Sequence, residues 1–278
     1  MRLAFIWLLV PISFAQDIQI NSTYLMKMIV PYVGPVELTT NQIVASGFFR
    51  SSEKVDAKKW IVSQFLDEER GNIFIEGVEN ILSYNKEDEE YWIESPEDFF
   101  SSSDSRKKEK GFIKFLFLET DKISKEDNKI TNKIERIEDD RFITVNGFRT
   151  KKWITTIFMT EDKKVIFEEW CVDTLPLLVI IDSLKEDITE KFNPYQDSKR
   201  IDESEFDPFL SSELFIRMME TDIYVKPIKG HPVKMNMTIY KNKGEVFSIG
   251  FEMLELYASP FDASSFSIPE KFKRIKIN

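Results

Sequence analysis

The sequence has one cysteine and one histidine among 278 residues, and this scarcity removes several classes of site. A zinc site of cysteine and histidine ligands needs several such residues, and a Ser–His–Asp triad would have to use His231, between Gly230 and Pro232. Glycine-rich phosphate loops, dinucleotide-binding fingerprints and EF-hand spacings are also missing. We therefore expect no catalytic residues, no metal and no cofactor, and we interpret His231 as a turn residue.

Basic residues are outnumbered. The chain has 38 lysine and arginine residues against 48 aspartate and glutamate residues, a formal net charge of −10. Lysine and arginine supply most nucleic-acid affinity by neutralising phosphates, so this balance argues against a nucleic-acid partner. The acidic residues gather at Glu87–Glu90, Glu135–Asp140 and Asp202–Asp207. Such runs are usually solvated surface, although paired carboxylates could also serve a hydrolase or bind Ca²⁺ weakly.

The single cysteine, Cys171, excludes an intramolecular disulfide, so the stability of the domain must come from packing. Residues Glu168–Val172 surround it in an alternating, strand-like pattern. We interpret Cys171 as a small buried core residue, with a reactive thiol as the alternative.

A long apolar run occurs only at the N-terminus. Leu3–Val10 is unbroken, Arg2 is the only charged residue in Met1–Ala15, and Ser13 and Ala15 are small residues at the positions that a signal peptidase reads. This pattern is typical of a cleavable secretory signal, and the run is too short to span a membrane as a helix. We expect residues 1–15 to be removed, and residues 16–278 to form a single exported, periplasmic domain that is soluble after cleavage.

Most of the remaining chain alternates apolar and polar residues, as antiparallel strands do. Asn146-Gly147 is the strongest hairpin signal. Because strands and helices do not alternate, we predict the α+β class, with a strongly curved antiparallel sheet that forms a half-open barrel and helices that cover its concave face. Strands are expected at Tyr24–Tyr32, Gln42–Arg50, Val55–Asp67, Asn72–Gly77, Ile81–Tyr84, Glu90–Ile93, Gly111–Ile123, Lys133–Glu138, Arg141–Val145, Phe148–Met159, Val165–Val172, Val233–Tyr240, Glu245–Tyr257 and Phe272–Ile277.

Two segments have helical periodicity. Thr174–Lys191 has Pro176 in its first turn, and Asp207–Glu220 has Asp207 as its expected N-cap. If these helices cover the concave face only partly, a cavity lined by their apolar side chains remains, and otherwise the same side chains are ordinary core. A short helix is also expected at the start of Ser95–Lys110. The candidate ligand-binding residues are Leu177, Leu178, Ile181, Leu214, Phe215, Met218 and Met219.

The C-terminal third carries two patterns. Gly230–Lys234 reads G-x-P-V-K, and Phe266–Lys273 reads F-x-x-P-x-x-F-K. With Val145–Lys152 and Phe167–Trp170 in the middle of the chain, they resemble a family of exported bacterial proteins of unknown function. That family is similar in plan to the periplasmic lipoprotein-localisation carriers and the mycobacterial lipid carriers. The resemblance implies their half-open antiparallel barrel covered by helices and a hydrophobic ligand, and it implies no catalytic residues.

These observations predict a non-enzymatic, exported protein that binds or shuttles a hydrophobic ligand, such as a lipid or the acyl chain of a lipoprotein. The alternative is an envelope assembly or chaperone-like module, whose apolar groove docks a segment of a transient membrane or envelope protein partner. A hydrolase built on paired carboxylates is a third interpretation.

Overall fold

The computed structural model describes residues 18–30, 34–57, 69–99, 133–160, 162–192, 211–219, 223–242 and 244–276. The predicted signal peptide and the predicted strand at Gly111–Ile123 lie outside these residues. The elements are β1 (Ile18–Val30), β2 (Gly34–Ala45), β3 (Phe48–Ala57), β4 (Glu69–Ile75), β5 (Ile81–Asn85), β6 (Glu90–Glu94), β7 (Lys133–Val145), β8 (Phe148–Phe158), β9 (Lys163–Val172), α4 (Pro176–Phe192), α5 (Ser212–Met218), β10 (His231–Lys241), β11 (Gly244–Pro260), the 3-10 helix η3 (Ala263–Phe266) and β12 (Lys273–Arg274).

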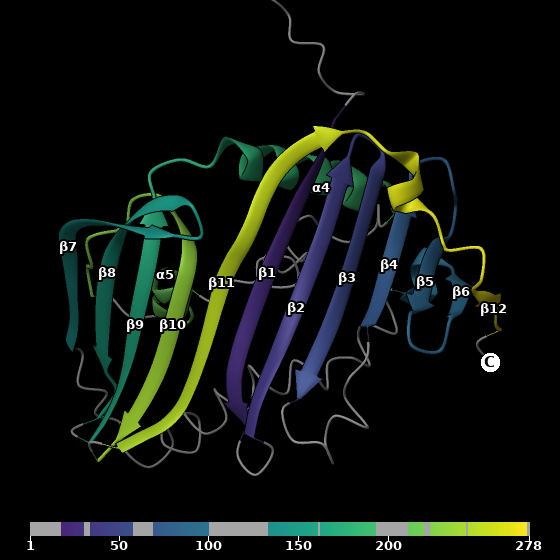
Figure 1. Cartoon of the computed structure of the whole chain (residues 1–278). Helices are drawn as coiled ribbons and strands as arrows, with labels where there is room; N and C mark the ends of the chain where they lie inside the picture. Colours follow the sequence, from purple (N-terminus) through teal and green to yellow (C-terminus); the bar gives the residue numbers. More distant parts are fainter. Residues whose placement is uncertain are drawn as a thin grey trace, which may run out of the picture.

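All 12 strands belong to one sheet, in the order β12-β6-β5-β4-β3-β2-β1-β11-β10-β9-β8-β7 (Figure 1). Neighbouring strands are antiparallel, except for the short parallel pair of β12 and β6. Within the described part of the chain the end strands β7 and β12 do not pair with each other, so the sheet is open. The prediction of a large, mainly antiparallel sheet with few helices is therefore confirmed, whereas its strong curvature and a concave face covered by helices stay predictions.

Turn residues set the strand boundaries. Asn146 and Gly147 both have positive φ angles, 47° and 84°, as a two-residue hairpin turn requires, and the predicted hairpin between β7 and β8 is confirmed. The prediction of one strand at Gln42–Arg50 is wrong. Gly47, with φ 75°, forms a turn that divides this segment between β2 and β3, because residues other than glycine rarely adopt that angle.

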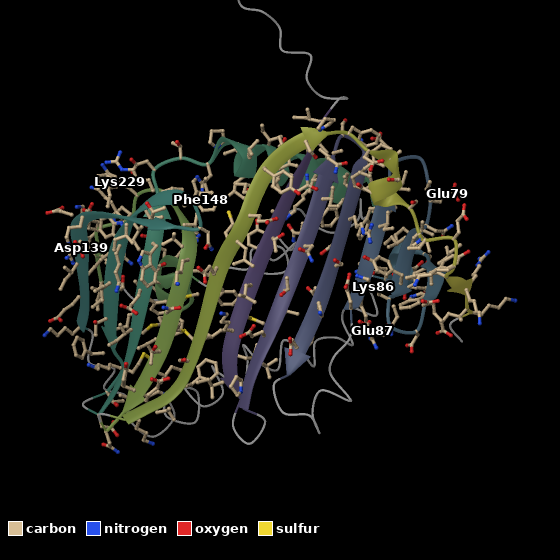
Figure 2. The ribbon with its side chains drawn as sticks, viewed as in Figure 1. Glu79, Lys86, Glu87, Asp139, Phe148 and Lys229 are labelled. Atoms are coloured by element: carbon tan, nitrogen blue, oxygen red, sulfur yellow. The ribbon has the colours of Figure 1, made fainter. Side chains whose placement is uncertain are left out.

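The β7–β8 hairpin reaches across to the middle of the sheet. Asn146 Nδ2 donates hydrogen bonds to the Met253 carbonyl oxygen at 2.9 Å and to Glu252 Oε1 at 3.0 Å, both on β11. Phe148, the first residue of β8, packs against the core beside β11 (Figure 2). The turn that sequence reasoning located thus also ties the edge of the sheet to its centre.

Both helices lie on the same side of the sheet, behind it in the view of Figure 1. Helix α4 begins at Pro176, close to the predicted start, and contacts β2, β3 and β11. Helix α5 begins at Ser212, with Ser211 as its N-cap, so the described start of this helix lies beyond the predicted cap Asp207, which is outside the described residues. A helical turn at residues 96–99 agrees with the start of the short helix expected there.

The apolar core has three clusters. On the helix side, the methionine cluster lies under α5 and the α4 cluster lies under α4, and on the opposite side the C-terminal cluster lies beneath η3 and the end of the chain. The buried residues of the methionine cluster are Tyr24, Ile157, Val165, Phe167, Val172, Phe215, Val233, Met235, Met237, Ile249 and Met253. Those of the α4 cluster are Ile20, Val44, Phe49, Phe74, Ile81, Phe99, Ile181, Ile188 and Phe192. Those of the C-terminal cluster are Ala45, Ile73, Tyr84, Phe266 and Phe272.

Candidate functional site

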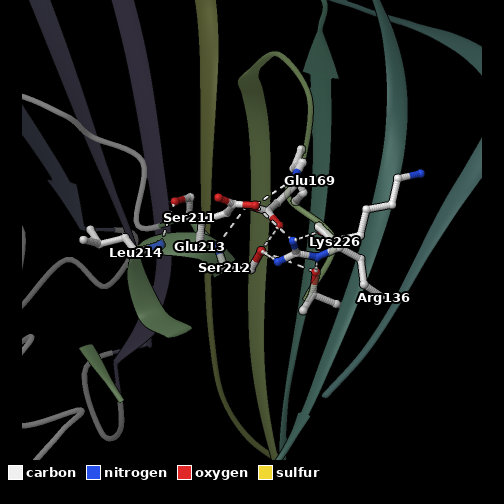
Figure 3. Close-up of polar contacts among 9 residues, drawn as sticks. Arg136, Glu169, Ser211, Ser212, Glu213, Leu214 and Lys226 are labelled. Atoms are coloured by element: carbon white, nitrogen blue, oxygen red, sulfur yellow. Dashed lines mark hydrogen bonds and ion pairs between the residues drawn. The ribbon is translucent and has the colours of Figure 1, made fainter. Parts of the chain in front are cut away.

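A buried glutamate lies on the helix side of β9. Glu169 alternates with Phe167 and Cys171 along the strand, and its side chain is 1% exposed. One carboxylate oxygen accepts a hydrogen bond from the Ser212 backbone N–H at 2.9 Å, and the other accepts one from Ser212 Oγ. Ser212 is the first residue of α5, so the glutamate holds the beginning of this helix against the sheet (Figure 3).

An arginine from the edge strand completes the cluster. Arg136, on β7, has a side chain that is 4% exposed, and its Nε donates to Thr155 Oγ1 at 2.9 Å. Its Nη2 donates to Ser212 Oγ and its Nη1 to Glu213 Oε1, both at 3.0 Å (Figure 3). We call this cluster the α5 clamp, and its members are Arg136, Thr155, Glu169, Ser212 and Glu213.

The local sequence explains why the clamp forms at this end of α5. The first backbone N–H groups of any helix lack partners within the helix. Ser211 Oγ accepts from the Leu214 N–H at 3.2 Å, and Glu169 accepts from Ser212. Glu213 Oε1 also accepts the Ile228 N–H at 2.6 Å, which fixes the segment before β10 to the same helix turn. The clamp therefore joins β7, β8, β9, α5 and that segment.

Burial dominates the electrostatics of the clamp. It raises the pKa of Glu169 above its ordinary value of 4.5, and the hydrogen bonds from Ser212 and the positive charge of Arg136 oppose this rise without cancelling it. Burial, followed by the negative charge of Glu169, raises the pKa of Cys171 to about 12. The thiol therefore stays neutral at physiological pH, and its interpretation as a buried core residue is confirmed.

The clamp is suited to positioning a helix. Ser212 is fully buried, and its hydroxyl oxygen already contacts Glu169, Arg136 and Thr155. A molecule could reach this hydroxyl only if α5 moved away from the sheet. The single histidine, His231, is exposed at the start of β10 and takes no part in the clamp.

We expect the contribution of Glu169 to the stability of the protein to fall as pH rises above its ordinary pKa of 4.5. The folded protein binds the Glu169 proton more tightly than the unfolded chain does, so this contribution is fully present below the unfolded pKa and is lost as pH rises through the raised folded pKa. Glu169→Gln removes the titrating group, and its free energy of unfolding should vary less with pH. Urea unfolding from roughly pH 4 to 8 measures this.

The matched control is Glu168→Gln, which changes the neighbouring carboxyl group on the opposite side of the sheet, where it pairs with Lys152. This variant keeps the Glu169 carboxyl group, so it should keep the loss of stability that Glu169 causes as pH rises. An unchanged pH dependence in Glu169→Gln would contradict the assignment of the effect to Glu169.

The predicted ligand-binding residues lie on α4 and at α5, but they divide between two clusters. Ile181 is 1% exposed in the α4 cluster, and Phe215 is 5% exposed in the methionine cluster. Leu177 packs on the α4 cluster, Met219 on the methionine cluster and Leu178 on both, and Leu214 is half-buried. The side chain of Met218 lies outside the described residues. Whether these residues contact a ligand stays a prediction.

Sequence reasoning missed a concentration of methionine beneath α5. Seven of the nine methionines belong to the methionine cluster, either buried in it or packed against it. Two pairs, Met26 with Met28 and Met235 with Met237, are spaced by two residues along β1 and β10, so each pair points to one side of the sheet. This spacing could have revealed the cluster, because methionines at every second position of a strand lie on one side of the sheet and form one surface there.

No protein-family model matches the chain, and no curated protein gives a significant match. In the part of the chain that the structure describes, no helix is long and apolar enough to cross a membrane. The same residues contain no group of three or more histidine, cysteine, aspartate or glutamate side chains arranged to hold a metal ion.

Proposed function

We propose that the protein is a non-enzymatic carrier that holds an apolar molecule, such as a lipid or the acyl chain of a lipoprotein, between its sheet and helices α4 and α5. We further propose that it is exported to the periplasm and that its sheet has the curved, half-open form of the lipoprotein-localisation carriers. The observation that carries the first proposal is the methionine cluster, because the flexible thioether side chain repacks around guests of different shape.

The way in which α5 is held supports the same proposal. This seven-residue helix is fixed at its N-terminal end by the polar α5 clamp, while its apolar residues Phe215, Ile216 and Met219 rest on the methionine cluster. Contacts between apolar side chains are not directional, so they can reform around a guest, whereas the hydrogen bonds of the clamp keep the helix in register. Leu178 and Leu256 belong to both clusters on the helix side, so the apolar layer is continuous from α5 to α4.

The first test is native mass spectrometry of the chain, expressed with export and purified without detergent. A discrete adduct that extracts into organic solvent and is identified as a lipid is the expected result. A ligand-free mass that stays unchanged after incubation with phospholipid vesicles would overturn the proposal. Recovery of a stoichiometric protein partner from envelope extract, with no lipid, would also overturn it and would favour the interaction module.

A second test replaces methionines by leucine. Met235→Leu, Met237→Leu and Met253→Leu together keep the buried volume, so we expect each to cost less than about 1.5 kcal/mol of unfolding free energy. The branched side chain adapts less, and the variant should extract with fewer lipid species than the wild-type protein does. The control is Ile73→Leu in the C-terminal cluster, on the opposite side of the sheet, which should leave the range of bound lipids unchanged.

A further inference from the structure

The side of the sheet opposite the helices contains a groove of about 560 Å³. It lies over β1, β2, β10 and β11, and the strand register places Asn236, Gly250, Lys27 and Glu37 side by side in one row across it. Its volume lies in the range of small-molecule sites. The methionine cluster is on the other side of the same strands, so this groove is separate from the proposed lipid site.

Uncharged polar side chains line part of the floor of the groove. Asn236 and Thr238 on β10 and Ser248 on β11 line it, and Gly250 on β11 lies directly across from Asn236. A Cβ atom at Gly250 would lie 2.8 Å from Asn236 Oδ1, so the glycine is what allows the amide to lie across β11. The amide and the two hydroxyls can each donate or accept hydrogen bonds.

The wall of the groove is apolar. Leu25 and Ile29 on β1 and Pro35 on β2 line this part, and Ile29 is 54% exposed. An exposed isoleucine beside a hollow leaves apolar surface in water that a ligand could cover.

The charged residues around the groove compensate one another. Lys234 Nζ lies 3.6 Å from Glu252 Oε1, Lys152 pairs with Glu168, and Lys27 faces Glu37 directly across β1 and β2. A further carboxylate, Glu245, also lines the groove. Opposite charges in three neighbouring pairs leave little net field to select a charged ligand.

We propose that this groove binds an uncharged saccharide. A sugar ring has a face of C–H groups and an edge of hydroxyl groups, which match the apolar wall and the polar floor. The C–H face would lie against Leu25 and Ile29, and the hydroxyls would bond to Asn236, Thr238 and Ser248. Because most of the charged residues around the groove lie beside an opposite charge, we expect binding to change by less than about twofold when salt is raised.

The test is an NMR titration of the ¹⁵N-labelled protein with neutral oligosaccharides of glucose, mannose, galactose and N-acetylglucosamine. Amide shifts that saturate and centre on Asn236, Ser248 and Gly250 are the expected result for at least one sugar. The proposal is overturned if none of these sugars shifts the groove amides at millimolar concentration. It is also overturned if sulfated or sialylated sugars bind more tightly with a steep salt dependence.

Two variants locate the site. Gly250→Val fills the groove and should weaken binding by about tenfold or more. Asn236→Leu keeps the volume and removes the amide, so it tests the floor even if the valine variant does not fold. The control is Thr156→Leu, which adds an apolar side chain to the same side of the sheet on β8 and should leave binding unchanged. Equal affinity in Asn236→Leu and the control would contradict the proposal.

Discussion

Replacing Arg136 by alanine is expected to lower the free energy of unfolding by about 3 kcal/mol. Breaking a buried ion pair by removing one partner costs roughly 3–5 kcal/mol, because the remaining charge is left buried without compensation. Here the variant leaves Glu169 and Glu213 without their cation and removes a donor from Ser212 and from Thr155. We expect the lower end of that range because Glu213 is 36% exposed and water can solvate it.

The control for this prediction is Arg141→Ala, on the same strand. Arg141 pairs with Asp139 at 2.7 Å, but its side chain is 83% exposed, so solvent replaces the lost pair and we expect little change. Arg136→Lys keeps the charge but cannot reproduce the fork of hydrogen bonds, so its stability should be intermediate. Urea unfolding of the three variants measures the difference. Equal losses for Arg136→Ala and Arg141→Ala would show that the clamp adds no stability.

The clamp connects this prediction to the proposed function. If the methionine cluster adapts to a guest, the helix above it must remain attached while the side chains beneath it repack. Arg136 and Glu169 hold only the N-terminal turn, so the apolar residues of α5 can move about a fixed end. Loss of the clamp should therefore make lipid exchange faster in the fraction of Arg136→Ala that stays folded. Slower exchange would mean that the clamp helps to release the ligand.

Local patterns predicted much of the fold. Alternation located most strands, and the period of Leu177, Ile181, Leu184 and Ile188 located α4, because each signal depends on which side of one element faces the core. Asn146-Gly147 located a turn because its backbone angles are restricted. The division of Gln42–Arg50 was missed because apolar residues continue on both sides of the turn, and only Ser46 and Gly47 interrupt them.

The candidate sites depended on contacts between distant segments. The parity of β9 could have placed Glu169 on the buried side with Phe167 and Cys171, but nothing local indicated Ser212 as its partner. The groove is set by the pairing of β1 with β11, which joins the first described strand to one near the C-terminus. The sequence therefore predicted which helix faces are apolar, but it did not predict which residues of distant strands contact those faces.

Replacing Gly71 by alanine is expected to cost about 3 kcal/mol of unfolding free energy. The new Cβ atom would lie 2.3 Å from Tyr84 Oη and 2.4 Å from its Cζ, so the ring must move. Tyr84 is 2% exposed, and the Arg50 guanidinium donates to its hydroxyl at 2.9 Å while also donating to the Ser265 carbonyl. Overpacking alone costs roughly 1–3 kcal/mol, and displacing this ring also weakens these bonds.

The damage should spread to the C-terminal segment, because Tyr84 packs on Phe272 and shares Arg50 with the residues of η3. Hydrogen exchange should therefore rise along residues 261–274 of Gly71→Ala. Gly244→Ala is the control, since its added Cβ meets only the Lys241 carbonyl at an ordinary 3.6 Å. In a Tyr84→Leu background the ring is absent, and Gly71→Ala should then cost much less. If Gly71→Ala still costs about as much unfolding free energy in this background, the loss comes from the backbone of β4 and not from the Tyr84 ring.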